Sequence, residues 1–270
     1  MAGTSISSGR IAAAVVLAAA LVCVACGGSS NASPSSPSPT PTIPVNSACG
    51  AIGTAIVNGV ACSTAASPVV LVNMRDTLGV PLGSCSGTVI ASRAILTAAH
   101  CLAGGVGSVR IFFGTGTEIV ARTFAAYPGY REDDPAALDV GVVLMSDDLA
   151  RTPVPVLVSR DARVGETAII AGWGNDQNQL AATLRAGSTT ITAVGSTQVQ
   201  TQYSSNGSAV CSGDSGGPLL LLEGGVWAIA GITSAVSTTA CTFGTNYFAN
   251  VRNSNISAFI LGQVPDASRR

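Results

Sequence analysis

Short apolar runs, separated by turn residues, recur along residues 56–264. Their lengths and their content of β-branched side chains predict β-strands, because such side chains suit an extended backbone. The predicted strands cover residues 69–74, 87–90, 94–97, 109–113, 140–145, 167–171, 218–222, 226–232 and 247–251. Short strands at this spacing are typical of a β-barrel or a β-sandwich. Near the end of the chain, Ser254 is predicted to cap a short helix with Ile256, Phe259 and Ile260 on one face.

A different apolar pattern occupies the N-terminus. Arg10 precedes the apolar run Ile11–Val22, which is shorter than a usual membrane-spanning helix and is typical of an export signal. Residues Val24–Gly27 resemble a bacterial lipoprotein processing site, so residues 1–25 are expected to be a signal peptide and Cys26 to carry lipid. Ordinary signal cleavage, which would release a free secreted protein, is the alternative.

Three segments outside the apolar pattern complete the expected organisation. Residues 26–47 are rich in serine, proline and threonine. Such a composition buries little apolar surface and stays extended, so the segment is expected to be a tether. Residues 48–55 then form a short segment ahead of the domain at 56–264, and residues 265–270 form a C-terminal tail.

Composition and charge restrict the function further. A length of 270 residues allows one large β domain or two small ones. The formal net charge is −1 and no basic run is long, which argues against nucleic acid as a partner. Charged residues make up only 10% of the chain while glycine is abundant, and this suits a secreted β-rich protein with many tight turns.

The chain has eight cysteines, of which Cys23 would leave with the signal and Cys26 would carry lipid. The remaining six are Cys49, Cys62, Cys85, Cys101, Cys211 and Cys241. An even number of cysteines in an exported chain indicates disulfides. Zinc binding is the competing interpretation, but these six show neither a Cys-x-x-Cys pattern nor a histidine partner pattern that would support it.

Candidate chemistry is concentrated in the stretch Cys211–Pro218, which holds Ser215 next to glycine and aspartate. Glycine allows backbone angles that other residues resist, so the stretch suits a nucleophile on a tight turn. The backbone amides of Gly213 and Ser215 can then point together at a developing oxyanion.

Two further motifs precede this stretch. His100, the only histidine of the chain, lies in Thr97–Cys101, and Asp139 stands directly before the apolar run Val140–Leu144. A serine hydroxyl needs a base within hydrogen-bond reach, and the base needs an orienting group. In the order His, Asp, Ser, the three motifs resemble the trypsin/chymotrypsin-like serine proteases.

This resemblance covers nearly all of residues 56–264 and implies the fold. The expected architecture is all-β, with two six-stranded antiparallel β-barrels and a short C-terminal helix. The resemblance also implies that Ser215 attacks the scissile carbonyl, that His100 is the base and that Asp139 orients it. Water would then hydrolyse the acyl-enzyme.

Activation is also implied by the resemblance. The segment Ala55–Gly59 looks like the family's cleavage site, and a cut after Ala55 would free the amine of Ile56 to pair with Asp214. The uncut chain would then be a weak zymogen, cut by itself or by a separate protease. The alternative is that Ile56 and Val57 merely begin the first strand.

Disulfide pairings follow from the resemblance as well. Cys85 would pair with Cys101 behind the histidine, and Cys211 with Cys241 beside the substrate pocket. Cys49 and Cys62 remain as a third pair. That pair would keep the short prosegment attached after cleavage.

By the same resemblance, the substrate pocket is formed by Ala209, Val210, Ser234, Val236 and Asn246. Trypsin-like members have an acidic residue where this chain has Ala209, so cleavage after basic residues is not expected. Val236 and Asn246 replace pocket glycines, which makes the pocket shallow and mostly apolar, as in elastase-like members. We expect a modest preference for Ala, Val or other small residues before the cleaved bond. Ser234 is expected near the catalytic aspartate, with its backbone pairing the substrate strand.

The sequence therefore predicts a secreted or surface-anchored serine endopeptidase whose partners are peptide or protein substrates. Membrane contact is expected only through lipid on Cys26, and a monomer is the default expectation. No cofactor or metal is expected, since the only histidine is already used and no calcium loop is recognisable. The alternatives are a catalytically inactive binding module on a lipoprotein tether and a structural surface lipoprotein.

Overall fold

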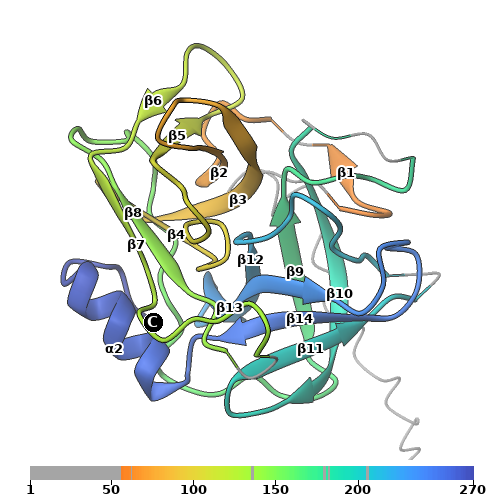
Figure 1. Cartoon of the computed structure of the whole chain (residues 1–270). Coiled ribbons are helices and arrows are strands. Elements are labelled where there is room, and N and C mark those ends of the chain that lie inside the picture. Colours follow the sequence, from red (N-terminus) through yellow and green to blue (C-terminus); the bar gives the residue numbers. More distant parts are fainter. Residues whose placement is uncertain (1–55, 62, 135–136, 179–180, 182, 205–206) are drawn as a thin grey trace, which may run out of the picture. The chain divides into compact units, whose positions relative to one another are not determined.

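The computed structural model describes residues 56–61, 63–134, 137–178, 181, 183–204 and 207–270. Within this part of the chain, two antiparallel sheets of seven strands each form the fold, and one helix follows them (Figure 1). The expected all-β class is therefore confirmed. The expectations for the signal peptide, the tether, Cys26, Cys49, Ala55 and Cys62 lie outside the described residues.

The first sheet is built from the N-terminal half of the domain. Its strands, in spatial order, are β6 (Ile119–Val120), β5 (Ser108–Phe112), β2 (Val69–Arg75), β3 (Pro81–Ala91), β4 (Ala94–Thr97), β8 (Gly141–Leu144) and β7 (Thr123–Ala126). Apolar side chains of the central strands are fully buried, among them Val72, Ile95 and Val142. The pairings of the described residues leave this sheet open between β6 and β7, whereas a closed six-stranded barrel was expected.

The second sheet closes on itself. Its order is β1 (Val60–Ala61), β10 (Arg185–Val194), β11 (Gln198–Gln202), β14 (Thr245–Asn250), β13 (Val226–Val236), β12 (Pro218–Glu223) and β9 (Thr167–Gly172). An additional pairing of β9 with β10 closes six of these strands into a barrel, and β1 adds to β10 outside the ring. The second expected six-stranded barrel is therefore present.

The apolar pattern identified the well-buried strands and missed β1, β6, β7, β10 and β11. The largest omission, β10, contains Ser188, Thr189 and Thr190 where the pattern requires a run of large apolar residues. Its buried positions include Ala186 and Gly187, and a Cβ added at Gly187 would collide with the side chain of Ser208. Small side chains are required on this strand, so it carries a weak hydrophobic signal.

The helix α2 (Ser254–Gln263) forms where the sequence predicts one, but its cap differs. Asn253 is the N-cap, and its side-chain oxygen accepts hydrogen bonds from the backbone N–H groups of Asn255 and Ile256. The prediction of Ser254 as the cap was wrong by one residue. Asparagine serves this role as well as serine, because either side chain can accept a bond from the first helical turn.

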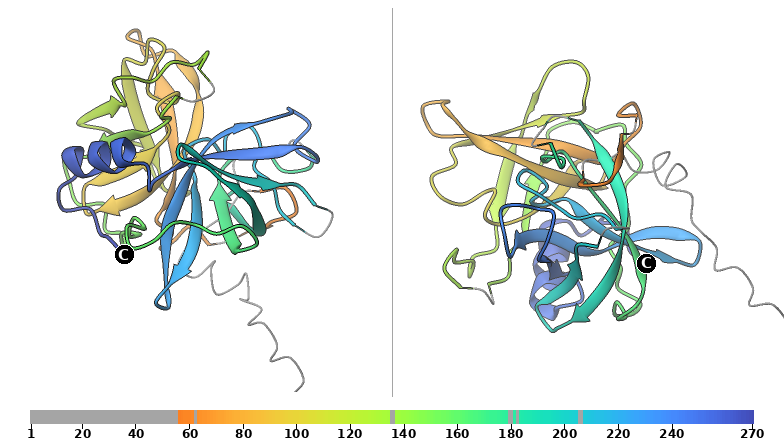
Figure 2. Two further views of the ribbon diagram at one scale, coloured as in Figure 1. Left: turned by 90° about the horizontal axis from the view of Figure 1, so that it is seen from below. Right: turned by 90° about the vertical axis from the view of Figure 1, so that its right-hand side faces the viewer.

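The expected apolar face of α2 attaches the helix to the first sheet (Figure 2). Ile256 and Ile260 are fully buried, and the Phe259 ring meets Tyr127 edge to face with centroids 5.6 Å apart. The residues after the helix are also bound to the domain, since Ser268 N–H donates to Ile90 and Arg270 N–H to Val156. No helix among the described residues is long and apolar enough to span a membrane.

Candidate active site

Strand pairing brings His100 and Asp139 together. Thr97 at the end of β4 pairs with Gly141 at the start of β8, so the turn after β4 and the residues before β8 lie side by side. The His100 backbone N–H donates to Asp139 Oδ1 at 3.0 Å, and the His100 ring atom Nδ1 lies 2.8 Å from Asp139 Oδ2. The aspartate thus fixes both the backbone and the ring of the histidine.

The carboxylate of Asp139 is buried, with 3% of the residue exposed. Burial acts to raise its pKa, but hydrogen bonds and the charge interaction with His100, together with a bond from Ser234, hold the pKa below its ordinary value. Ser234 Oγ donates to Asp139 Oδ2 at 2.6 Å, which places Ser234 beside the aspartate as the sequence predicts. Asp139 is therefore a charged acceptor that favours a proton on Nδ1 of His100.

The turn that carries Ser215 is bound by both sheets. The Ser86 N–H on β3 donates to the Ser215 carbonyl at 2.7 Å, and the Gly216 N–H donates to the Thr233 carbonyl on β13 at 2.7 Å. Gly216 has φ +82°, and a Cβ there would lie 2.3 Å from the Ser86 carbonyl oxygen. Only glycine allows this turn to fit between the sheets.

Two backbone N–H groups of this turn are free for a ligand. The Ser212 carbonyl accepts from Asn175 N–H at 2.8 Å, and the Gly213 carbonyl accepts from Ser86 Oγ at 2.9 Å. Within the part of the chain that the structure describes, the N–H groups of Gly213 and Ser215 donate to no protein acceptor. Such a pair of donors on one tight turn suits a developing oxyanion.

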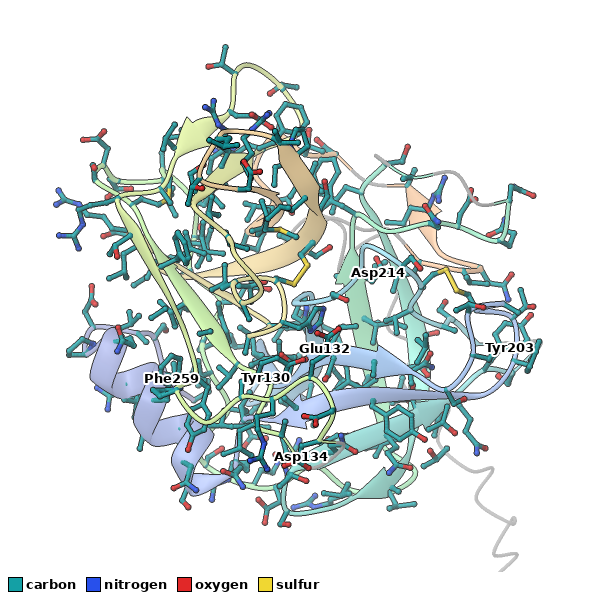
Figure 3. The ribbon with its side chains drawn as sticks, in the orientation of Figure 1. Tyr130, Glu132, Asp134, Tyr203, Asp214 and Phe259 are labelled. Carbon is teal, nitrogen blue, oxygen red and sulfur yellow. A yellow bond between two sulfur atoms is a disulfide. The ribbon has the colours of Figure 1, made fainter. Side chains whose placement is uncertain are left out.

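Asp214, the next residue in the turn, is fully buried (Figure 3). Its carboxyl oxygens accept from Gly174 N–H at 2.9 Å and Cys211 N–H at 2.8 Å. Burial raises the pKa of Asp214 to about 8, although the two backbone bonds and the charge of Arg185 act to lower the pKa. At neutral pH this carboxyl is therefore largely protonated in the uncut chain.

The segment that begins at Ile56 pairs with residues that stand shortly before Asp214 in the chain. Ile56 is fully buried, and Val57 exchanges backbone hydrogen bonds with Ala209 at 3.1 and 3.4 Å. Ala209 stands two residues before Cys211, whose N–H binds Asp214.

The predicted pocket residues come from the neighbouring strands β13 and β14 and from the segment between β11 and β12. Ala209 and Val210 are buried, and Val236 on β13 pairs across the ladder with Asn246 on β14. The Asn246 side-chain amide is also buried and donates to Thr201 Oγ1 at 3.0 Å. Ala209 lies in an apolar cluster that contains the cysteine pair Cys211–Cys241.

The structure contains both disulfides that the resemblance implies within the described residues, Cys85–Cys101 and Cys211–Cys241. The first joins β3 to the turn that carries His100, and the second joins the serine turn to the segment after β13. The sulfur atoms of Cys85 and Cys101 lie near the His100 ring, but they are bonded to each other and offer no thiolate to a metal.

A pocket of about 280 Å³ lies beside His100. Its lining combines catalytic candidates with residues that the sequence did not single out: His100, Tyr130, Glu132, Asp134, Ala137, Asp139, Gln198, Ser234 and Ala235. Figure 3 shows Tyr130, Glu132 and Asp134 close to one another on the segment before Asp139. Burial, Asp139 and Glu132 raise the pKa of Tyr130 to about 12. Tyr130, Glu132 and Asp134 stand shortly before Asp139 in the chain, and this position was the only signal in the sequence that could have indicated them as site residues.

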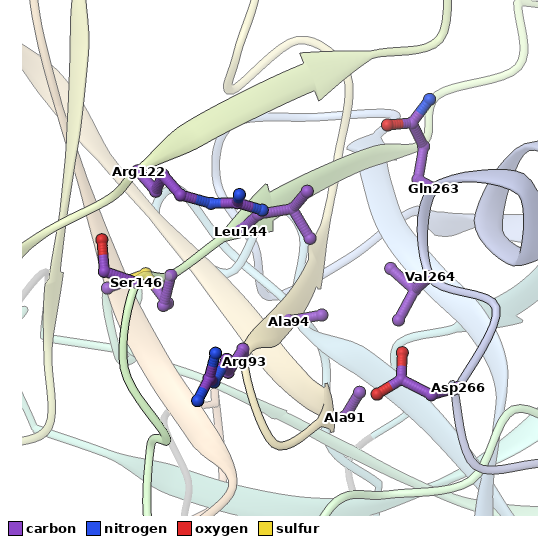
Figure 4. Close-up of a pocket in the computed structure, with 10 residues that line it drawn as sticks. Ala91, Arg93, Ala94, Arg122, Leu144, Ser146, Gln263, Val264 and Asp266 are labelled. Carbon is purple, nitrogen blue, oxygen red and sulfur yellow. The ribbon is translucent and has the colours of Figure 1, made fainter.

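A second pocket, of about 360 Å³, lies away from this site (Figure 4). It is formed between the β3–β4 turn, the end of β8 and the residues around the C-terminus of α2. Arg93, Arg122 and Asp266 bring both signs of charge to its lining, and none of the candidate catalytic residues contributes to it.

Comparisons with known proteins agree with this fold. A family model described as Trypsin matches residues 56–260. Chymotrypsin-like elastase family member 1 from Bos taurus is 29% identical over 187 residues, which cover 58% of this chain and 70% of the relative. Trypsin 5G1 from Aedes aegypti is 28% identical over 164 residues, which cover 50% of this chain and 60% of the relative.

A solved structure titled HL collagenase has a TM-score of 0.65 at 19% identity, and the match covers 77% of this chain and 98% of that chain. At this identity, the likeness concerns the fold. Sheet topology, the His100–Asp139 pair and the serine turn are those of a trypsin/chymotrypsin-like serine protease. Because the Trypsin family model matches well over half of this chain, the chain belongs to the trypsin family.

Asp214 predicts an unusual dependence of stability on pH. Its pKa in the folded, uncut chain is about 8, well above the ordinary 3.8. The folded state therefore keeps a proton that the unfolded state releases, and the contribution of Asp214 to stability is lost as pH rises from about 4 to about 8. In thermal melts of uncut Ser215→Ala protein, adding Asp214→Asn should flatten this decline.

The exposed Asp133→Asn is the matched control and should leave the slope of melting temperature against pH unchanged. An unchanged slope in Asp214→Asn would show that Asp214 is ionised throughout this range.

Proposed function

We propose that the protein is a serine endopeptidase that uses Ser215, His100 and Asp139. The observation that carries the proposal is the buried Asp139 carboxylate, which accepts both the backbone N–H and the ring of His100 while staying charged. Membership of the trypsin family supports a peptidase that acts on peptide or protein substrates.

In the proposed mechanism, His100 takes the hydroxyl proton of Ser215 as the serine oxygen attacks the scissile carbonyl. Asp139 keeps the other ring nitrogen protonated and stabilises the imidazolium that forms. The free N–H groups of Gly213 and Ser215 bind the oxyanion. His100 then gives its proton to the leaving amine, and water hydrolyses the acyl-enzyme by the same steps.

The residue before the cleaved bond is proposed to be small and apolar. Ala209 and Val210 offer no carboxylate for a basic side chain, and the pairing of Val236 with Asn246 puts two side chains where glycines would leave space. The similarity to chymotrypsin-like elastase family members supports this assignment.

Activation by a cut after Ala55 is also proposed, and the environment of the Asp214 carboxyl supports it. A fully buried carboxyl with a raised pKa is a site that an ammonium group would stabilise in its charged form. The buried Ile56 and the pairing of Val57 with Ala209 support a new N-terminus at this position.

The domain is proposed to work in an oxidising compartment outside the cytoplasm, and its two disulfides support this proposal. Anchoring through lipid on Cys26, with residues 26–47 as the tether, remains a proposal from the sequence. A monomer is proposed as the working form.

The triad predicts a specific pattern of labelling and turnover. A fluorophosphonate probe should label the processed protein and should not label Ser215→Ala. Asp139→Asn should lower kcat about 10⁴-fold, because the amide favours the wrong histidine tautomer. Asp133→Asn, an exposed carboxylate in the same segment, should retain activity. Absence of labelling in the processed protein would favour a binding module.

Pocket specificity is tested with peptides that vary only before the cleaved bond. Peptides with Ala or Val should have a higher kcat/KM than those with Arg or Phe. Since one methylene group changes kcat/KM by only about 10- to 200-fold in such pockets, the preference among apolar residues should be modest. Val236→Gly should improve cleavage after Phe. Faster cleavage after Arg than after Ala would refute the pocket assignment.

Activation predicts that Ala55→Pro blocks cleavage and leaves the chain weakly active. N-terminal sequencing and fluorophosphonate labelling of the same samples measure both properties. Ala48→Pro, upstream of the proposed cut, is the control and should still yield a chain that begins at Ile56. Full activity in uncut Ala55→Pro would exclude the zymogen.

A further inference from the structure

We propose that Ser86 is a positioning residue whose hydroxyl holds the oxyanion turn in its working conformation. The inference rests on the proposed function, because it assigns Ser86 to the same site. No motif in the sequence singles out this residue, and its side chain contacts neither a triad side chain nor a substrate in the proposed mechanism.

Ser86 is a buried polar residue at the junction of the two sheets. It lies on β3 and is 0% exposed. Its Oγ accepts from Trp173 N–H at 2.8 Å and donates to the Gly213 carbonyl at 2.9 Å. The hydroxyl has one proton to donate, and it uses this proton on the turn that carries the oxyanion donors.

The backbone of Ser86 joins the same structure. Its N–H donates to the Ser215 carbonyl at 2.7 Å, and its carbonyl accepts from Thr97 Oγ1 at 2.8 Å. Thr97 stands three residues before His100. Ser86 on β3 therefore connects the turn that carries Ser215 with the start of the turn that carries His100.

Gly213 needs such a restraint because its backbone is intrinsically free. Its φ of +93° is a conformation that glycine adopts easily and also leaves easily. The peptide planes on both sides of Gly213 are anchored through their carbonyl groups, the Ser212 carbonyl by Asn175 N–H and the Gly213 carbonyl by Ser86 Oγ. Since a trans peptide fixes N–H opposite to C=O, the Asn175 anchor sets the direction of the Gly213 N–H. The Ser86 anchor fixes the Gly213–Asp214 peptide, which lies between the peptide that carries the Gly213 N–H and the peptide that carries the Ser215 N–H.

Little space exists around the Ser86 hydroxyl for another group to replace it. A Cβ added at Gly172 would lie 2.9 Å from Ser86 Oγ and 2.3 Å from an Asp214 carboxyl oxygen. Removing the hydroxyl would therefore leave Trp173 N–H and the Gly213 carbonyl without their partner in a tightly packed site. The Gly213–Asp214 peptide can then rotate to satisfy the Gly213 carbonyl elsewhere. Because this peptide lies between the peptides that carry the two oxyanion donors, its rotation changes the angle between the Gly213 N–H and the Ser215 N–H.

Ser86→Ala tests this role through a transition-state readout. Losing one oxyanion donor outright costs about 10²- to 10³-fold in kcat, so partial misalignment of the Gly213 and Ser215 N–H groups should lower kcat about 10- to 100-fold. KM should change by less than about twofold, because substrate binding does not use the oxyanion donors to the same extent. The inhibition constant of a peptide boronic acid, whose adduct places an oxygen at these donors, should rise by the same factor as kcat falls.

Thr88→Val is the matched control on the same strand. Thr88 is 1% exposed, and its Oγ1 has no hydrogen-bond partner within the described structure, so the substitution removes a buried hydroxyl that holds nothing. Thr88→Val should leave kcat and the inhibition constant of the peptide boronic acid unchanged. If Ser86→Ala fails to fold, Ser86→Cys, with a weaker donor of similar size, should give an intermediate loss of kcat.

Two outcomes would overturn the proposal. The first is a Ser86→Ala or Ser86→Cys enzyme with wild-type kcat and boronate affinity. The second is a crystal structure of the Ser86→Ala, Ser215→Ala protein in which the Gly213 carbonyl keeps its direction. This structure also separates the two hypotheses, because it tests the turn even if wild-type protein shows no labelling and the proposed function fails.

Discussion

A carboxylate that is buried away from water needs hydrogen-bond donors to stay charged, and the site around Asp139 is arranged to supply them. Burial alone would neutralise the group, yet three hydrogen bonds from His100 and Ser234 keep it charged. These donors come from different segments of the chain: the turn after β4, and β13 of the second sheet. Asp139 therefore stays charged in its buried site only because both sheets supply donors, and the orientation of His100 depends on that charge.

Asp214 meets the same requirement in another way. It has two backbone donors and the more distant charge of Arg185, and these do not offset full burial, so the group holds a proton up to about pH 8. The two aspartates thus differ by the partners that the fold provides. Within the described residues, Asp214 contacts backbone donors and no cation directly. This is a physical reason to propose a cut that creates an ammonium group and a response of the turn before Ser215 to that cut.

The sequence predicted the residues whose chemistry is local and missed those whose role depends on packing. Ser215 and His100 stand in motifs that resemble those of the family, and Asp139 was singled out by the apolar strand that follows it. Strand β10 was missed because its interior positions require small side chains such as Gly187, which weaken the apolar pattern. Ser86 has no local signal at all, since a serine in a buried strand is recognised only when its partners, from distant segments, are known.

The nucleophile turn is better described as a product of the interface between the sheets than as a self-contained motif. Ser86 on β3 and Thr233 on β13 bind the carbonyl of Ser215 and the N–H of Gly216 from opposite sides. A glycine-flanked serine elsewhere in the chain would lack these restraints and would populate many conformations. Catalytic geometry must be held within about 0.5 Å to be effective, so residues that only hold the turn also contribute to the chemistry. For this reason, substitutions at the sheet interface should be judged by transition-state affinity and not by stability alone.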